Sequence, residues 1–281
     1  MKDNNTIFYS TASRGYALYA VTSLLSIRRF IPDAKLAILS FGLSDHEKKI
    51  LTKNHIELHE IDLTKQFYKT WDYPVECYYM FAGPELFYNL GYLYSVYIDG
   101  DVLCGSDPLA KMTAVEYLSG VGVSDGKKIF GDDWATIKKH WNVASTFKNS
   151  QRIQSGIVYF NNKKMSQEKL LNVAKRVFRD CVNLGIPRKG DDSLFALLQF
   201  LHFDSKKMTF LDLIYNFMPH FNKWKYPVQN LVFFHFTLDK PWKKRPYRHK
   251  NRDLDAFDPY VKAWRKILRK TSFIDWLKLT F

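Results

Sequence analysis

The stretch that decides the fold is YSVYIDGDVLC, residues 94–104. Its first half is mostly apolar, which is typical of a strand buried on both faces of a parallel sheet. Asp99 and Asp101 follow that strand directly, with Gly100 between them to let the backbone approach a ligand closely. Two carboxylates one residue apart repel each other at a sheet edge, and a divalent cation held between them removes the repulsion. The stretch therefore predicts a metal site.

Two other interpretations of this motif stay open. A solvated turn with two capping carboxylates explains so short a pattern equally well. Haloacid-dehalogenase-like phosphotransferases also carry D-x-D after an apolar strand, but their motif has a threonine where this chain has Leu103. Their motif also generally opens the fold, whereas three predicted strands precede Asp99, so this phosphotransferase is a minor alternative.

The segments before the motif alternate between strand and helix patterns. Residues 6–11, 34–41 and 56–63 predict strands. Apolar residues at helical spacing predict a helix after the first strand, and Ser44 with Glu47 forms a capping box that predicts a second. This alternation is typical of an α/β fold with a mainly parallel sheet, in which ligands bind beyond the carboxyl ends of the strands.

The pattern continues after the motif. We expect two further strands, in YLSGVGVSD (117–125) and QSGIVYFNN (154–162). They are followed by an amphipathic helix in 166–185, a second helix in DDSLFALLQFL (191–201), and an apolar run in LVFFHFT (231–237).

The composition describes a folded protein with anionic partners. Hydrophobic residues make up 46% and aromatic residues 16% of 281 residues, which excludes disorder over most of the chain. The first residues lack the apolar core of a signal peptide, and no apolar run approaches the roughly 18 residues that span a bilayer, so we expect a cytoplasmic protein. Three scattered cysteines indicate neither a disulfide framework nor a zinc site. The net charge of +14 favours nucleotide phosphates, nucleic acid or an anionic membrane.

Much of the positive charge lies near the C-terminus, so we expect an α/β domain over 1–242 and a basic, aromatic extension over 243–281. Residues 257–268 combine an apolar stripe with cations, and Asp258-Pro259 predicts the start of a helix there. Such a helix lies in an anionic membrane interface or packs on the body of the protein, and both alternatives stay open. Nucleic-acid binding is disfavoured because no known binding motif is present.

A second motif, HFTLDKPW at 235–242, complements the first. His235 ends an apolar run, and its imidazole completes an oxygen and nitrogen ligand set with the two aspartates, a mixture that suits Mn²⁺. Lys240 is a point charge suited to a phosphate. A lone histidine on an apolar strand is more often a core residue, but the two aspartates favour the metal ligand.

With both motifs, the chain resembles the family 8 glycosyltransferases, which include bacterial lipopolysaccharide galactosyl- and glucosyltransferases and glycogenin. The resemblance runs over most of residues 5–242, and five segments carry it in the right order. IFYSTASRGYALYAVTSLLSI resembles the opening strand and nucleotide-binding turn, YIDGDVLC the YLDADVLV motif, IQSGIVYFNNKKM the NSGVMLINLKKW segment, GDDSLFALL the DQDALN helix, and HFTLDKPW the H-x-x-G-x-x-K-P-W motif.

This resemblance implies a GT-A fold and a retaining enzyme that moves galactose or glucose from a UDP-sugar to a surface-glycan acceptor on lipid or protein. It also implies Mn²⁺, or Mg²⁺, as the cofactor. Residue by residue, it implies metal binding by Asp99, Asp101 and His235, diphosphate binding by Lys240, uridine binding by residues 11–16 with Thr11, Ser13 and Tyr16, and a donor sugar faced by Gln154 and Asp191.

The chain departs from the family pattern at several positions around the nucleotide sugar. Ser13 and Arg14 stand where acidic residues are frequent, Met80 where an arginine is common, Leu238 where the shortened last motif has its glycine, and Asp191-Asp192 where the family has Asp-Gln.

The second carboxylate of that pair bears on mechanism. Asp192 is a candidate to stabilise or attack an oxocarbenium-like state, as in retaining glycosidases. The alternatives are front-face displacement, in which the leaving phosphate helps to deprotonate the acceptor, and a purely structural pair at a helix N-terminus. A catalytically silent membrane- or nucleic-acid-binding protein on the same fold is the alternative to an enzyme.

Overall fold

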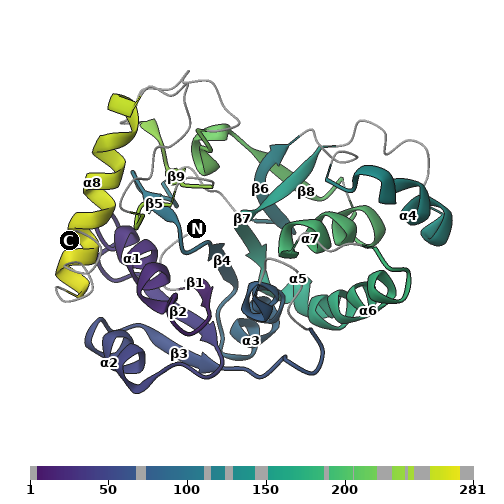
Figure 1. The fold of residues 1–281 in the computed structure, drawn as a ribbon, viewed down its shortest axis with the longest axis horizontal. Helices are drawn as coiled ribbons and strands as arrows, with labels where there is room; N and C mark the ends of the chain where they lie inside the picture. The colour runs from purple at the N-terminus through teal and green to yellow at the C-terminus, as the bar shows by residue number, and fades with distance from the viewer. Residues whose placement is uncertain are drawn as a thin grey trace.

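The computed structural model describes residues 5–67, 74–110, 115–123, 129–142, 151–186, 190–204, 206–219, 230–237, 240–243 and 254–272. Within these ranges, nine strands form two sheets (Figure 1). They are β1 (Thr6–Ala12), β2 (Lys35–Ser40), β3 (Glu57–Glu60), β4 (Tyr94–Ile98), β5 (Val102–Cys104), β6 (Leu118–Val123), β7 (Arg152–Asn161), β8 (Met208–Leu211) and β9 (Phe233–His235).

The large sheet has seven strands in the order β3-β2-β1-β4-β7-β6-β8. The first four of these are parallel, as are β6 and β8, whereas β7 is antiparallel to both of its neighbours. The short strands β5 and β9 form a separate antiparallel pair. The sheet is therefore mixed and mainly parallel, as expected.

Helices cover both faces of the large sheet (Figure 1). The capping box at the start of the second of them is present, with Ser44 and Glu47 bonded to each other's backbone as predicted. The helices are α1 (Ala17–Ile27), α2 (Asp45–Lys53), α3 (Gly83–Asn89), α4 (Trp134–Trp141), α5 (Asn162–Gln167), α6 (Leu170–Asn183), α7 (Gly190–Leu201) and α8 (Leu254–Thr271), with the 3-10 helices η2 (Val75–Ala82), η3 (Gly131–Asp133) and η5 (Leu213–Asn216).

Strand β1 is buried on both faces, which explains its continuous apolar run. Phe8 lies in one core with α1, α2 and α8, beside its sheet neighbours Leu36 and Val96. Ile7 and Tyr9 face the other core, which contains η2, α6 and α7. Successive residues of a strand point to opposite faces, so one strand supplies both cores.

One helix boundary differs from the prediction. Instead of a single helix over 166–185, the chain forms α5 and α6, and Lys169 between them has a left-handed backbone with φ of 52°. Met165 and Leu170 are both buried in the same core. Residues five apart on one straight helix point about 140° apart, so the break allows both side chains to reach that core.

The C-terminal helix also starts earlier than expected. It begins at Leu254, so Pro259 lies inside it and Asp258 is not its N-cap, contrary to the prediction. Its apolar face packs on the body of the protein, with Tyr260 stacked on Phe234 at 4.0 Å between ring centroids and Trp264 fully buried. The apolar face of this helix thus packs on the body of the protein, and association of the helix with a membrane stays a prediction. Among the described helices, none has the length and apolar character needed to cross a bilayer.

Candidate active site

A cavity of about 460 Å³ opens at the carboxyl ends of β1 and β4, the edge of the sheet where α/β folds bind ligands. The turn after β1, the first turns of α1, the start of α7 and the segment around Lys240 form its walls. Eight residues predicted for the site line this cavity. They are Thr11, Ser13, Tyr16, Asp99, Gly100, Asp101, Asp191 and Lys240.

Asp99, Asp101 and His235 direct their ligand atoms to one point. Nε2 of His235 lies 3.3 Å from Oδ1 of Asp101 and 3.5 Å from Oδ2 of Asp99, and the three ligand atoms lie within 4.8 Å of one another. Neighbouring ligands of an octahedral ion with bonds of about 2.1 Å lie about 3 Å apart. The three residues therefore fit a single divalent cation.

The β5–β9 pair brings the histidine to the aspartates. β5 begins directly after Asp101, and its Val102 pairs with His235 in β9. The N–H of Phe236 donates to the carbonyl of Asp101 at 2.9 Å. On the other side, the N–H of Asp99 donates to the carbonyl of Gly156 in β7 at 2.9 Å. Both aspartates are thus fixed through their backbones to neighbouring strands.

The two aspartates are in different electrostatic states. Burial raises the pKa of Asp99 to about 6, and the charge of Asp101 adds to this, although His235 opposes it. Burial acts on Asp101 in the same direction, but Lys240 and His235 outweigh it and lower the pKa of that carboxyl. Lys240 forms an ion pair with Asp101, and the hydroxyl of Tyr97 donates to Asp99 at 2.7 Å. A bound cation would hold both carboxylates in the ionised form.

Asp191 lies in the first turn of α7 and lines the cavity. Burial, followed by the charges of Asp99 and Asp192, raises the pKa of Asp191 to about 8. At neutral pH the metal-free protein therefore carries mostly the protonated acid there, which can donate a hydrogen bond to a ligand.

Asp192, the next residue along the chain, is bonded to an arginine and not directed into the cavity. The two guanidinium nitrogens Nη1 and Nη2 of Arg152 donate to Oδ1 and Oδ2 of Asp192 at 2.7 and 2.8 Å, and the N–H of Ser155 donates to Oδ1 at 3.1 Å. The arginine side chain is 3% exposed. Both oxygens of Asp192 are therefore occupied by fixed donors, and Asp192 is not among the residues that line the cavity.

Gln154 also lies outside the cavity lining. Its Oε1 accepts from the N–H of Gly156 at 2.7 Å and from Nδ2 of Asn216 at 2.6 Å. Asn216 in turn lies 3.0 Å from Nδ1 of His235. The side chain thus supports the histidine from behind, and the contact with the donor sugar that the resemblance implies for it stays a prediction.

The turn after β1 is held by a residue of α2. The N–H of Gly15, which has φ of 87°, donates to Oε1 of Glu47 at 2.6 Å. Burial raises the pKa of Glu47, but bonds from Ser44 and Gly15 outweigh this and lower it. The capping-box glutamate therefore has a second contact, which orders the turn predicted to bind the nucleotide.

Aromatic rings line the mouth of the cavity beside this turn. Tyr19 stacks on Trp242 with 4.1 Å between centroids, and Tyr16 is 55% exposed with its ring edge toward both. Lys240 lies over the Trp242 ring, 6.0 Å from its centroid. An exposed ring beside stacked aromatic side chains suits a flat, partly apolar ligand such as a nucleobase.

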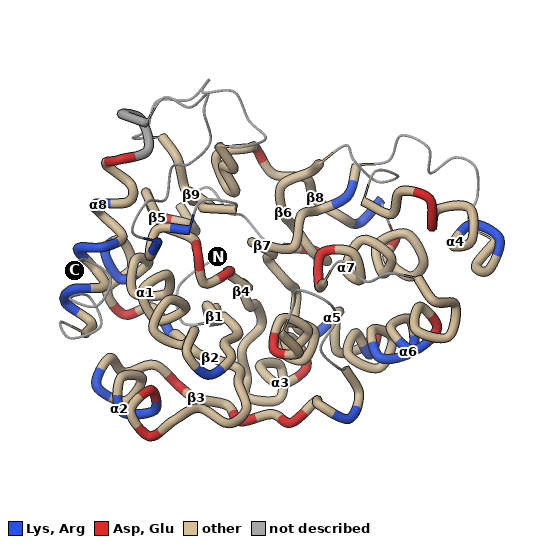
Figure 2. The backbone as a smooth tube through the Cα atoms, viewed as in Figure 1, with Lys and Arg blue, Asp and Glu red and all other residues tan. Residues whose placement is uncertain are grey.

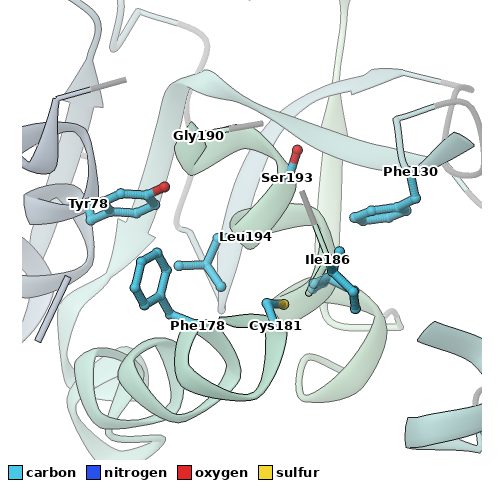
Figure 3. Close-up of a pocket in the computed structure, with 9 residues that line it drawn as sticks. Tyr78, Phe130, Phe178, Cys181, Ile186, Gly190, Ser193 and Leu194 are labelled. Atoms are coloured by element: carbon cyan, nitrogen blue, oxygen red, sulfur yellow. The ribbon is translucent and has the colours of Figure 1, made fainter. Parts of the chain in front are cut away.

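A second cavity beneath α7 is apolar and has a volume of only about 20 Å³. Figure 3 shows Tyr78, Phe178 and Leu194 pointing toward one another in it, with Cys181 beside them. It is too small for a sugar, and its walls belong to the core that supports α7. The predicted site residues instead line the larger cavity described above.

Sequence analysis missed two residues that support the site, Arg152 and Asn216. Arg152 begins a strand whose other residues are mostly apolar, and an arginine at such a place is a detectable signal for a buried ion pair. Asn216 belongs to the short helix η5 and has no such signal.

Two of the departures from the family pattern concern Met80 and Leu238. Met80 is buried in the core, and its carbonyl accepts a hydrogen bond from the Tyr9 hydroxyl at 2.7 Å. Leu238 lies outside the described residues.

Comparison with known proteins then gives the family. The model of glycosyl transferase family 8 matches residues 7–245. The chain belongs to glycosyltransferase family 8. This membership makes the haloacid-dehalogenase-like alternative wrong. No curated protein matches the sequence.

Solved family 8 glycosyltransferases share the fold. The galactosyltransferase LgtC, solved with donor and acceptor sugar analogues, matches with a TM-score of 0.66 at 15% identity over 94% of this chain and 96% of that one. The bifunctional glycosyltransferase WbbM gives a TM-score of 0.67 at 16% identity over 99% of this chain, which spans about half (52%) of WbbM. GlyE of Streptococcus pneumoniae TIGR4 gives 0.57 at 15% identity over 94% of this chain and 63% of GlyE. These similarities establish the GT-A fold of this family 8 member.

Proposed function

We propose that this glycosyltransferase moves a hexose, galactose or glucose, from a UDP-sugar to a surface-glycan acceptor on lipid or protein, with retention of configuration. The observation that carries the proposal is the convergence of Asp99, Asp101 and His235 on one point, beside a cavity that the two aspartates, Lys240 and aromatic rings line. Such a cavity offers separate places for a metal, a diphosphate and a base.

The donor set supports a divalent cation as cofactor. Two carboxylates and one imidazole suit Mn²⁺, and Mg²⁺ less well because it prefers oxygen ligands. Bound there, the ion would neutralise charge on the departing diphosphate. Asp99, Asp101 and His235 would hold it, and Lys240 lies on the same side, where its ammonium meets a phosphate oxygen.

For the chemical step, the positions of the two neighbouring aspartates favour front-face displacement. Asp191 lines the cavity and, when protonated, donates a hydrogen bond to a sugar hydroxyl. Asp192, the predicted nucleophile, has both oxygens bonded to Arg152. We therefore assign Asp192 to the positioning of Asp191 through the first turn of α7, and the deprotonation of the acceptor to the leaving phosphate.

The experiment is the release of UDP from a panel of UDP-hexoses with and without Mn²⁺. We expect one or more donors to release UDP only with the metal, and Asp99→Asn to abolish it. Lys163→Gln, an exposed change on α5, is the matched control. A folded protein that binds no UDP-sugar and releases no UDP would instead be the catalytically silent alternative.

We also propose that the protein attaches peripherally to the cytoplasmic face of a membrane through the outer face of α8. Figure 2 shows basic residues along this helix at one edge of the molecule. Lys262, Lys266, Arg269 and Lys270 are exposed there, while the opposite face packs on the body. A groove between α1 and α8 contains Arg29, Lys266 and Lys270 and, among its described lining residues, no acidic side chain. Its charge complements an anionic lipid headgroup.

Sedimentation with phosphatidylserine vesicles tests this attachment. At about 1 kcal/mol for each basic residue, Lys266→Glu with Lys270→Glu weakens binding by about 30-fold or more. Lys163→Glu with Arg179→Glu, on α5 and α6 at the other side of the molecule, is the control of equal charge (Figure 1). Equal sedimentation of the two double variants would exclude a specific role for α8.

A further inference from the structure

On its buried side, His235 is linked through Asn216 and Gln154 to a backbone N–H by a chain of hydrogen bonds. That N–H determines which atom donates and which accepts at every step of the chain. The N–H of Gly156 donates to Oε1 of Gln154 at 2.7 Å. Because an N–H cannot accept, the oxygen of the Gln154 amide, and not its nitrogen, must face it. That same oxygen accepts from Nδ2 of Asn216 at 2.6 Å.

The orientation of the Gln154 amide fixes that of Asn216, and Asn216 in turn fixes which nitrogen of His235 carries a proton. With Nδ2 of Asn216 committed to Gln154, its Oδ1 is the atom that lies 3.0 Å from Nδ1 of His235. An amide oxygen only accepts, so Nδ1 of His235 carries the proton. In the neutral imidazole the other nitrogen, Nε2, then has a lone pair, and Nε2 is the atom that faces Asp99 and Asp101.

This arrangement opposes what the two aspartates alone would favour. Carboxylates at 3.3 and 3.5 Å attract a proton on Nε2, and that tautomer cannot bind a metal through Nε2. Asn216 is fully buried and His235 is 3% exposed, so water does not replace the amide. The amide chain therefore selects the tautomer that binds a cation.

The packing around the ring keeps the chain in place. A Cβ on Gly156 would lie 2.2 Å from Cε1 and 2.7 Å from Nδ1 of His235, so the ring lies directly against this glycine. The N–H of His235 donates to the carbonyl of Phe217, the residue after Asn216, at 2.9 Å. Backbone and side chain thus fix the histidine to the same short segment.

We propose that Asn216 is a positioning residue that holds His235 as the Nδ1–H tautomer, with Gln154 fixing the orientation of the Asn216 amide. The inference rests on the metal site of the proposed function. Mutation of a residue that hydrogen-bonds to a metal-ligating histidine typically lowers metal affinity by about 10- to 100-fold. We therefore expect Asn216→Leu, which removes the acceptor, to weaken Mn²⁺ binding by that factor.

The first measurement needs neither metal nor substrate. In protein labelled with ¹⁵N-histidine and freed of metal, NMR reports which ring nitrogen carries the proton, and His235→Gln identifies the signal. We expect Nδ1–H in the wild type and a shift toward Nε2–H in Asn216→Leu. An Nε2–H tautomer in the wild type, or an unchanged tautomer in Asn216→Leu, would overturn the proposal.

Calorimetric titration with Mn²⁺ is the second measurement. Asn216→Asp retains an oxygen acceptor toward Nδ1, so we expect it to bind Mn²⁺ within a few-fold of the wild type, whereas Asn216→Leu does not. Gln154→Met leaves Asn216 in place but frees its amide to rotate, and we expect an intermediate loss. Gln154→Met also carries the test if Asn216→Leu does not fold. Equal affinities in all four proteins would refute the role of Asn216.

These outcomes are separable from failure of the proposed function. A wild type that shows the Nδ1–H tautomer and binds Mn²⁺ but releases UDP from no UDP-sugar contradicts the donor assignment and supports the role of Asn216. Conversely, metal-dependent UDP release with unchanged tautomer and affinity in the Asn216 and Gln154 variants supports the enzyme and refutes the positioning role.

Discussion

The pair of Arg152 and Asp192 gives the sharpest test of mechanism, because the two roles of Asp192 predict different behaviour. In Asp192→Asn the guanidinium, 3% exposed, keeps one acceptor oxygen but loses the second acceptor and the negative charge of a carboxylate that is 29% exposed. Removing one partner of a buried ion pair costs about 3–5 kcal/mol. The partial exposure of the carboxylate places the expected loss near the lower end, about 3 kcal/mol.

This loss converts to a measurable change in melting temperature. Unfolding entropies of about 2.1 cal/mol/K per residue give about 0.6 kcal/mol/K for a chain of this length. Differential scanning calorimetry should therefore show a decrease of about 5 °C for Asp192→Asn. The double variant Arg152→Met with Asp192→Asn removes the buried charge as well, and we expect it to recover most of the decrease.

Turnover of the double variant then decides the mechanism. If Asp192 positions Asp191, the recovered variant releases UDP and transfers sugar within about tenfold of the wild-type rate. If Asp192 is the nucleophile, no restoration of stability replaces it, and the rate falls by about 10³-fold or more. A stable double variant with such a loss would refute the positioning role, and an unchanged melting temperature in Asp192→Asn would refute the energetics.

Three further predictions concern stability. Trp264→Ala, at a fully buried ring of α8, should cost about 3–5 kcal/mol, or about 5–8 °C in calorimetry, whereas a free tail would show no change. Glu47→Gln should lower the free energy of unfolding by about 1 kcal/mol at pH 7. Because the pKa of Glu47 in the folded protein lies below its ordinary 4.5, the stability difference between wild type and variant should shrink as pH falls below 4.5. A stability difference that does not change with pH would contradict this. In EDTA, the raised pKa of Asp191 means that stability falls as pH rises from 3.8 toward about 8, so melting temperatures at pH 5 and pH 8 should differ less in Asp191→Asn than in the wild type.

The sheet and its binding edge were predictable because they depend on local patterns. The buried run before Asp99 and the capping box of Ser44 and Glu47 are visible in a few consecutive residues, and both are present. The break at Lys169 was not predictable, because it depends on Met165 and Leu170 sharing a core that the sequence does not display.

The residues of the cavity wall that stand in local motifs were predictable, whereas the residues that support them from elsewhere in the fold were not. Aspartates after a strand and a histidine beside a Lys-Pro-Trp segment are rare enough to notice. Asn216, by contrast, acts through one amide oxygen, and an asparagine in a short 3-10 helix is common. The direction in which Asp192 points depends on Arg152, which lies 40 positions earlier, and only the fold brings the two together.

The pairing of β5 with β9 has a consequence for synthesis of the chain. Asp101 and Lys240 are 139 positions apart, and His235, the proposed third metal ligand, lies at the end of β9 shortly before that lysine. A ribosome therefore releases nearly the whole α/β body before any complete cation site exists. Until then, a nascent chain that has folded its first strands lacks the proposed set of three metal ligands, so the proposed metal-dependent transfer would begin only after β9 has left the ribosome.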